Sequence, residues 1–191
     1  MNDPYSELGL TQELAVSPDD IDSAYREASR CRHPDFGGND EDYELVRQAA
    51  DLLKSPSRRL RWALDSVGVE WDERGSVPTS VMDLFSPIAG VLQKVDGFVV
   101  EREKAKSALG KAVLDVGVPA LKKELEKMLE KLEGEEVFLV GKFGEFDRIG
   151  WSQSVEEMAE ASRGLAFVEK WQGQVRAGMG KLFQVLLGGE E

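Results

Sequence analysis

The side chains best suited to chemistry in this sequence lie together in residues 31–35. The sole cysteine, Cys31, is followed by the sole histidine, His33, and then by Pro34 and Asp35. One cysteine permits no internal disulfide and no paired-cysteine redox motif, and one histidine excludes a metal site that needs two imidazoles. A thiol–imidazole pair is disfavoured, because residues two apart do not face each other on a helix. We expect no metal and no cofactor, and a protein-binding or a carboxylate-based role remains. No carboxylate pair stands out in the sequence, so no residue is predicted to be catalytic.

The tripeptide His33-Pro34-Asp35 carries groups suited to recognition. An exposed Asp35 carboxylate can accept a bidentate bond from an arginine. The His33 ring offers a donor, and Pro34 fixes the backbone so that less entropy is lost on docking. A lone histidine before a proline at a helix end is, however, most often a plain loop residue. The surrounding elements must decide between these two interpretations.

Composition excludes several classes of function. The 191 residues carry 24 basic and 36 acidic side chains, a formal net charge of −12, and an acidic surface repels nucleic acid phosphates. The longest uncharged stretches, near residues 84–94 and 182–189, are far shorter than the roughly 20 apolar residues of a membrane span. The N-terminus lacks the basic and apolar segments of a secretory signal. We therefore expect a cytoplasmic protein with no nucleic acid and no membrane partner.

Capping signals predict four short helices in the front of the chain. Asp-Pro and Ser-Pro pairs are strong helix starts, because the first side chain caps the helix and proline suits the first helical position. The predicted helices cover residues 4–9, 18–32, about 42–54 and 56–67. The second helix must end before Pro34. The tripeptide is therefore expected in a polar loop between the second and third helices, together with Gly37 and Gly38.

Two further side-chain placements follow from these helices. The string Arg58, Arg59 and Arg61 is expected on an exposed helical face. Cys31 is expected to be a small, half-buried helix residue.

The back of the chain is also helical by its pattern. Apolar seams at a spacing of three and four run over residues 81–95, 121–132 and 165–186. Pro87 and Gly90 are expected to bend the first of these helices, and Gly134 is expected to end the second. Residues 137–149 fit either a helix or a short hairpin, and a helix is favoured. Such seams predict an antiparallel helical bundle, so that the whole chain is expected to be all-α.

The front of the chain resembles the J-domain of DnaJ-type co-chaperones. DPYSELGL is similar to that family's opening turn, AYREASRCRHPD to its second helix and loop, and YELVRQAADLLKSPSRRLRWAL to its third and fourth helices. The resemblance spans residues 3 to about 67. It implies a four-helix domain whose hairpin presents the tripeptide to the ATPase domain of a DnaK-type chaperone. It also implies electrostatic steering by the second helix, here through Arg26 and Arg30.

Four positions depart from the family pattern. Asp22 and Glu27 stand where many members have lysine or arginine, and Phe36 stands where lysine commonly follows the tripeptide. Arg32 takes a position usually held by tyrosine. Electrostatic steering is therefore expected to be weaker than in a general DnaJ protein.

Beyond the J-domain, the sequence is similar to HscB-type proteins of iron–sulfur cluster assembly. No Gly/Phe-rich linker or Cys-rich module follows, WALDSVGVEW resembles the end of an HscB-type J-domain, and the segments around Trp151 and Trp171 resemble the end of the HscB chain. The resemblance implies a J-domain at 1–68, a linker at 69–78 and an antiparallel bundle at 79–191 that binds a client or scaffold protein. Candidate client contacts, which would otherwise lie in the bundle core, are Met82, Leu84, Phe85 and Leu92.

These features predict a J-domain co-chaperone that docks on a DnaK-type chaperone, stimulates its ATPase and delivers a client, with an HscB-like role in iron–sulfur cluster assembly. Two alternatives stay open, namely a J-like interaction module that activates nothing, and a general folding co-chaperone without a cluster-related client. A third alternative, an unrecognised hydrolase, would need Cys31 or a carboxylate as its reactive group. The chain itself is not expected to be an enzyme.

Overall fold

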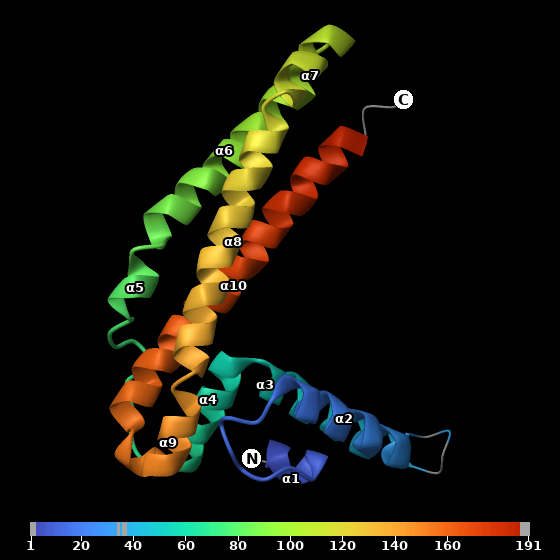
Figure 1. Cartoon of the computed structure of the whole chain (residues 1–191). Coiled ribbons are helices and arrows are strands. Elements are labelled where there is room, and N and C mark those ends of the chain that lie inside the picture. Colours follow the sequence, from blue (N-terminus) through green and yellow to red (C-terminus); the bar gives the residue numbers. More distant parts are fainter. Residues whose placement is uncertain (1–2, 34, 36–37, 188–191) are drawn as a thin grey trace. The chain divides into compact units, whose positions relative to one another are not determined.

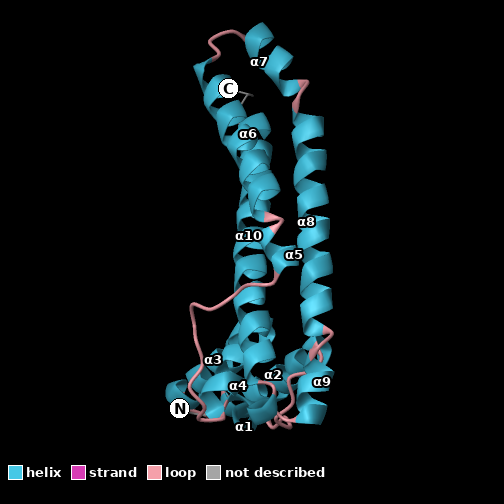
Figure 2. Ribbon diagram, turned by 90° about the vertical axis from the view of Figure 1, so that its left-hand side faces the viewer, coloured by secondary structure: helices cyan, strands magenta, loops and turns pink. Residues whose placement is uncertain are grey.

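The regular structure of this chain is helical. The computed structural model describes residues 3–33, 35 and 38–187, and every regular element within them is a helix (Figures 1 and 2). This result confirms the predicted all-α fold. Within the same residues, no helix is both long and apolar enough to cross a membrane.

Contacts divide the chain into two compact units. The first unit contains Met1–Ser76 and Phe138–Ala166, and the second contains Val77–Val137 and Phe167–Glu191. These units differ from the expected division of the chain into consecutive domains, because the segment Phe138–Ala166 packs with the front of the chain. The functional domains expected from the sequence stay a prediction.

In the first unit, four short helices form the front of the chain, as the capping signals predict. They are α1 (Pro4–Leu8), α2 (Pro18–Arg32), α3 (Asp40–Lys54) and α4 (Pro56–Ser66). Each follows a side chain that accepts a backbone N–H of the first turn, and these capping residues are Asp3, Ser17, Asn39 and Ser55. Such a cap contributes about 1 kcal/mol. α3 begins slightly earlier than predicted, because Asn39 supplies its cap.

A buried apolar core holds α2 and α3 together as a hairpin. Ile21 of α2, Val46 and Leu53 of α3, and Leu60 of α4 are all fully buried. Burying one such side chain contributes about 1.5–3 kcal/mol. Figure 1 shows α2 and α3 side by side, with the end of α2 and the start of α3 away from α4. The core therefore supports the hairpin at whose far end His33 follows α2.

Arg59 is buried, which corrects the expectation that it lies on an exposed face. Its side chain is 4% exposed. Its guanidinium donates to the carbonyl oxygens of Leu53, Leu14 and Val16, at 2.8, 2.6 and 2.9 Å, and lies 5.9 Å from the ring centroid of Phe143. A buried charge is tolerated where hydrogen bonds replace its hydration. Burial also lowers the pKa of Arg59 from its ordinary value.

Residues 138–166 belong to the first unit because Asp147 holds them to the loop between α1 and α2. Asp147 lies in α9 (Phe143–Ile149), which is followed by the short 3-10 helix η2 (Trp151–Gln153). Its carboxylate accepts the backbone N–H groups of Leu14 and Ala15, each at 2.9 Å, and the indole N–H of Trp151 at 2.8 Å. Asp147 therefore binds backbone N–H groups, and Arg59 binds backbone carbonyl groups, of the same loop.

The second unit is a bundle of antiparallel helices. It contains α5 (Thr79–Met82), α6 (Phe85–Lys104) and α7 (Ala108–Asp115), and most of α8 (Val118–Val140) and α10 (Val155–Leu187). Buried side chains from the three long helices form its core, and they include Val91, Val95 and Phe98 of α6, Leu125, Met128 and Leu132 of α8, and Val168, Val175 and Leu182 of α10. The three predicted seams therefore face one another.

Two glycine and proline signals act differently from the prediction. The helix expected over residues 81–95 is divided, because α5 ends at Met82 and α6 begins at Phe85. Pro87 therefore lies in the first turn of α6, where a backbone N–H has no helical partner and its absence costs nothing. Gly134 does not end α8, because Leu132 and Leu139 are both fully buried one heptad apart and continue the seam past it. The helix favoured for residues 137–149 is observed, with an interruption before Phe143.

Candidate functional site

The tripeptide begins where α2 ends. His33 is the residue that follows the last turn of α2, and its backbone is extended (φ −68°, ψ 136°). The Asp35 side chain is 81% exposed and the His33 side chain 38% exposed. Pro34, Phe36 and Gly37, which also carried sequence expectations, lie outside the described residues. Among the described tripeptide residues, the carboxylate is thus the more open to a partner.

Contacts with Asp35 and Tyr43 orient the imidazole of His33. Its Nδ1 accepts the backbone N–H of Asp35 at 3.1 Å, and the Asp35 Oδ2 lies 3.6 Å from the same nitrogen. Its ring meets the ring of Tyr43 on α3 edge to face, with centroids 5.0 Å apart and planes at 77°. Because Nδ1 accepts a hydrogen bond, the neutral imidazole carries its proton on Nε2. The ring is therefore a structural brace of the loop as well as a donor.

Gly38 closes the loop against the end of α2. Its N–H donates to the His33 carbonyl at 3.1 Å. A Cβ at this position would collide with the backbone carbonyl of Arg32. Only glycine fits so close an approach of two backbone segments. From the sequence, Gly38 is expected only as part of a polar loop, and this close approach was not predicted.

Arg26 and Arg30, the predicted steering residues, are exposed and one turn apart on α2. Arg26 donates to the hydroxyl of Ser23. Asp22, which departs from the family pattern, is paired with Lys54 of α3 at 2.6 Å, and this contact lowers the pKa of the Asp22 carboxyl. The negative charge of Asp22 is thus locally compensated, whereas Glu27 is exposed.

Tyrosines link the loop to the body of the hairpin, and the sequence patterns above do not single them out. A hydrogen bond with Tyr25 of α2 raises the pKa of Tyr43. The Lys54 ammonium lies 5.2 Å from the Tyr25 ring centroid. His33, Tyr43 and Tyr25 therefore form a continuous row from the loop to Lys54. The spacing of tyrosines on two facing helices is the sequence signal that points to this row.

Arg32 and Cys31 end α2 in different environments. Arg32 forms an ion pair with Glu7 of α1, which ties the last turn of α2 to the first helix. Cys31 is exposed and not half-buried as expected. Ile21 marks the side of α2 that packs on the apolar core. Cys31 does not lie at a helical spacing of three, four or seven residues from Ile21, and its side chain is exposed.

The four candidate client residues have different environments in the second unit. Met82 is 51% and Phe85 56% exposed, whereas Leu84 and Leu92 are partly covered. The ring centroids of Phe85 and Trp171 are 5.8 Å apart, and those of Trp171 and Phe167 are 5.5 Å apart. Phe167 is 37% exposed. Met82, Phe85 and Phe167 are named the apolar patch below.

Leu92 belongs to the packing of the bundle. Its methyl group lies close to Gly178 of α10, where a Cβ would be 3.3 Å away. The close approach of α6 and α10 at this point uses the absence of a side chain at Gly178. Leu92 is therefore a packing residue, in line with the alternative that the sequence left open.

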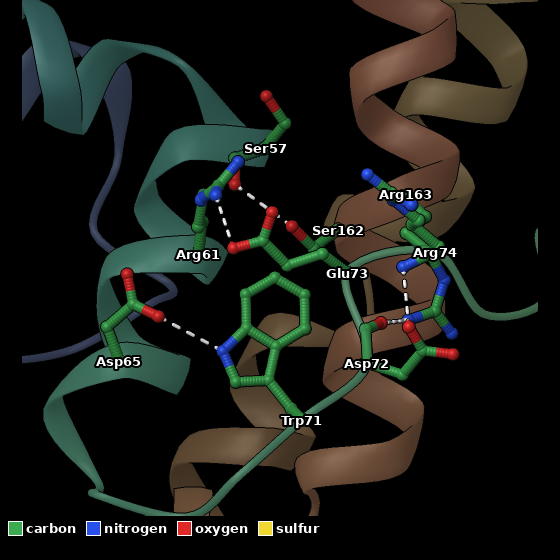
Figure 3. A network of polar contacts seen from close by, with 9 residues as sticks. All are labelled: Ser57, Arg61, Asp65, Trp71, Asp72, Glu73, Arg74, Ser162 and Arg163. Carbon is green, nitrogen blue, oxygen red and sulfur yellow. Dashed lines mark hydrogen bonds and ion pairs between the residues drawn. The ribbon is translucent and has the colours of Figure 1, made fainter.

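The segment after α4 is fastened to the first unit by a polar network (Figure 3). The Trp71 indole N–H donates to Asp65 at 3.0 Å, and Arg61 pairs with Glu73 at 2.6 Å. Arg163 of α10 donates to the carbonyl oxygens of Asp72 and Ser76. A cavity of about 550 Å³ lies beside this segment. Among the described residues, no group of histidine, cysteine and acidic side chains could hold a metal ion.

Comparisons with known proteins agree with this geometry. No model of a known protein family matches the chain. The DnaJ protein homolog 1 of Allium porrum is 46% identical over 44 residues, which are 23% of this chain and 11% of that protein. The chaperone protein dnaJ 3 of Arabidopsis thaliana is 36% identical over 55 residues, 29% of this chain and 13% of that protein. The matched segments are of the size of a J-domain, and the chain spans only a small part of the length of these relatives.

A solved structure extends the similarity to the whole architecture. The chaperone HscB from Vibrio cholerae superposes with a TM-score of 0.56 and 17% sequence identity, over 95% of this chain and 99% of that one. This likeness concerns the fold. Together with the matches to DnaJ proteins, it shows that this chain is similar to DnaJ-type proteins over a segment the size of a J-domain and has an all-helical architecture similar to that of HscB.

Proposed function

We propose that this chain is a co-chaperone that docks on a DnaK-type chaperone through His33, Pro34 and Asp35 and stimulates its ATP hydrolysis. The observation that carries the proposal is the exposed Asp35 carboxylate at the tip of a hairpin whose loop is braced by His33 and Gly38. The similarity to DnaJ proteins over the J-domain supports the same partner class.

The braced loop suits docking for an entropic reason. A flexible loop must be ordered when it binds, and the cost reduces affinity. Here the His33 ring is held by Tyr43 and by the Asp35 backbone, so that less freedom remains to be lost. The Asp35 carboxylate can then accept a bidentate bond from an arginine of the chaperone.

Electrostatic steering would come from the exposed stripe of Arg26 and Arg30. Lys54 compensates Asp22, so this departure from the family pattern weakens the positive field of α2 less than the sequence suggests. Glu27 is exposed, and we expect its negative charge to slow encounter with an acidic chaperone surface. Association should therefore fall as ionic strength rises.

The proposal is tested by the rate of ATP hydrolysis of a DnaK-type chaperone from the same cell. We expect the wild-type chain to raise this rate, and the His33→Gln and Asp35→Asn variants to lose most of the increase while retaining helical content. Asp51→Asn, an exposed acid on α3 away from the loop, is the matched control and should stimulate fully. Stimulation that survives in both loop variants would contradict the proposal.

The client is proposed to be an iron–sulfur scaffold protein, bound on the second unit. The support is the HscB-like fold and the exposure of the apolar patch, defined above by Met82, Phe85 and Phe167. Apolar contacts of this kind anchor protein interfaces when a partner covers them.

Titration calorimetry of the full chain with the scaffold protein of the same cell tests this client. Met82→Gln should weaken binding by about 1–2 kcal/mol, because one apolar anchor is lost. Val137→Gln, also exposed and on α8, should leave the affinity unchanged. An undetectable wild-type affinity, together with protection of a denatured model protein from aggregation, would favour the general folding co-chaperone.

A further inference from the structure

The segment from Lys104 to Lys123 has the opposite charge to the rest of this acidic chain. It reads KAKSALGKAVLDVGVPALKK and holds five lysines and one acidic residue, Asp115. The carboxylate of Asp115 is already paired with the buried Arg102 at 2.6 Å. Glu101 and Glu103 lie just before the segment, so the positive charge begins at Lys104. We name residues 104–123 the basic tip.

The helix within the basic tip turns an apolar stripe to solvent. Leu109 and Val113 lie on α7 (Ala108–Asp115), and Val116 directly follows its last residue with a helical backbone (φ −58°, ψ −30°). At i, i+4 and i+7, the three side chains therefore share one face. They are 76%, 65% and 79% exposed, and no residue of α7 is buried. Adjacent exposed apolar side chains of this size mark an interaction surface.

α7 stands at one end of the bundle in the second unit. Figures 1 and 2 both show it at the turn between α6 and α8, beyond the end of the long helical segments. Lys104, Lys106, Lys122 and Lys123, which flank α7 in the sequence, are all exposed. The stripe is therefore bordered by cations on both sides along the chain.

Charge and size decide which partner fits this surface. A second copy that paired tip to tip would bring two lysine clusters together, which is unfavourable. An eight-residue helix is about 12 Å long, and its stripe is much smaller than the roughly 800 Å² that each partner buries in a stable protein complex. Binding to an anionic lipid surface needs no groove and no large interface. Aliphatic side chains insert among the headgroups, and the lysines that border them are attracted to the lipid phosphates.

We propose that the basic tip binds an anionic membrane surface, with Leu109, Val113 and Val116 in the headgroup region and the flanking lysines on lipid phosphates. The tip lies on the membrane and does not cross it. The expectation that the chain has no membrane partner rested on the length of its uncharged stretches. That length excludes a helix that crosses the membrane, and it does not exclude binding to the membrane surface. Membrane attachment is a property separate from docking on a chaperone.

Vesicle cosedimentation of the full chain tests the proposal. We expect binding to vesicles of mixed phosphatidylglycerol and phosphatidylcholine, little binding to phosphatidylcholine alone, and weaker binding at high salt. Lys104→Glu with Lys106→Glu should reduce partitioning by about thirtyfold or more. Adding Leu109→Gln with Val113→Gln to these changes should abolish the binding that remains. The matched controls, Lys131→Glu and Val137→Gln, are exposed on α8 outside the tip and should bind like the wild type.

Three results would overturn the proposal. One is equal binding to anionic and neutral vesicles, and another is wild-type binding by both tip variants. The third is retention of the chain on immobilised polyglutamate through the tip lysines without any binding to vesicles, which would assign the tip to an acidic protein. Helical content measured by circular dichroism accompanies each variant, so that a folding defect is not read as lost binding.

Discussion

The two compact units join their helices with different kinds of contact. In the first unit, Arg59 and Asp147 reach across the fold and hydrogen-bond the backbone of one loop, the loop between α1 and α2. In the second unit, apolar seams carry the packing of the long helices. The polar contacts between its helices include surface ion pairs, such as Lys181 with Asp96, and the pair of the buried Arg102 with Asp115. Directional bonds fix a loop in one position, whereas an apolar seam holds helices without specifying loop geometry.

This difference matches the roles proposed for the two units. A docking loop gains affinity from a rigid support, because ordering costs are then met during folding. A bundle that offers apolar side chains to a client needs only its overall packing. The first two of the following variants test whether the polar contacts of the first unit carry more stability than those of the second, and the other two test the hairpin itself.

The largest effect is expected from Arg59→Met. The change leaves the carbonyl groups of Leu14, Val16 and Leu53 without their donor in a buried site, so we expect a loss of about 3 kcal/mol in the free energy of unfolding. Urea denaturation followed by circular dichroism measures it. Arg58→Met, at an exposed neighbouring position, should change stability little, and equal effects of the two variants would refute the distinction.

Asp147→Asn is expected to cost about 2 kcal/mol. An amide retains one acceptor oxygen, whereas the carboxylate accepts the N–H groups of both Leu14 and Ala15. Asp96→Asn in the second unit is the comparison, since it breaks an exposed ion pair worth at most about 0.5 kcal/mol. Urea denaturation midpoints of the two variants are compared with that of the wild type. A larger shift for Asp96→Asn than for Asp147→Asn would contradict the greater stability assigned to the polar contacts of the first unit.

Gly38→Ala should affect docking more than stability. The added methyl group meets the Arg32 carbonyl, so that the loop must move while the core of the hairpin remains. We expect a loss of about 1 kcal/mol in stability and a clear loss of ATPase stimulation. The exposed Gly90 of α6 has open space for a Cβ and serves as the control. Full stimulation by Gly38→Ala would show that the loop conformation does not matter.

The smallest effect is expected from Glu44→Gln on α3. Hydrogen bonds from Arg47 and Gln48 lower the pKa of Glu44 from 4.5 to about 2. A lowered pKa in the folded chain adds stability above pH 4.5, and this contribution is lost as the pH falls toward 2. The variant should therefore be slightly less stable than the wild type at neutral pH and equal to it in strong acid. A difference that grows with acidity would contradict this sign.

Local signals predicted the hairpin well, and long-range contacts explain what they missed. Serine and proline at positions 17–18 and 55–56 set helix starts whatever the rest of the chain does. The burial of Arg59 depends on carbonyl groups around residue 15 and on the ring of Phe143. No local pattern encodes partners so far apart in the sequence.

Glycine and proline were weaker signals in the bundle for the same physical reason. A glycine ends a helix only when no apolar seam continues beyond it, and Leu139 continues the seam past Gly134. The tripeptide could be singled out from sequence because its composition and its flanking caps are local. The bracing of His33 by Tyr43 became visible only once α2 and α3 were side by side.

The most direct test of the account is single-turnover ATP hydrolysis by the DnaK-type chaperone of the same cell, measured against increasing concentrations of wild-type chain and of Asp35→Asn. The account predicts a saturable rise in rate with the wild type and almost none with the variant, at equal stability of the two chains. A wild type that leaves the rate unchanged, or a variant that matches it, would contradict the claim that the exposed Asp35 carboxylate is the docking contact.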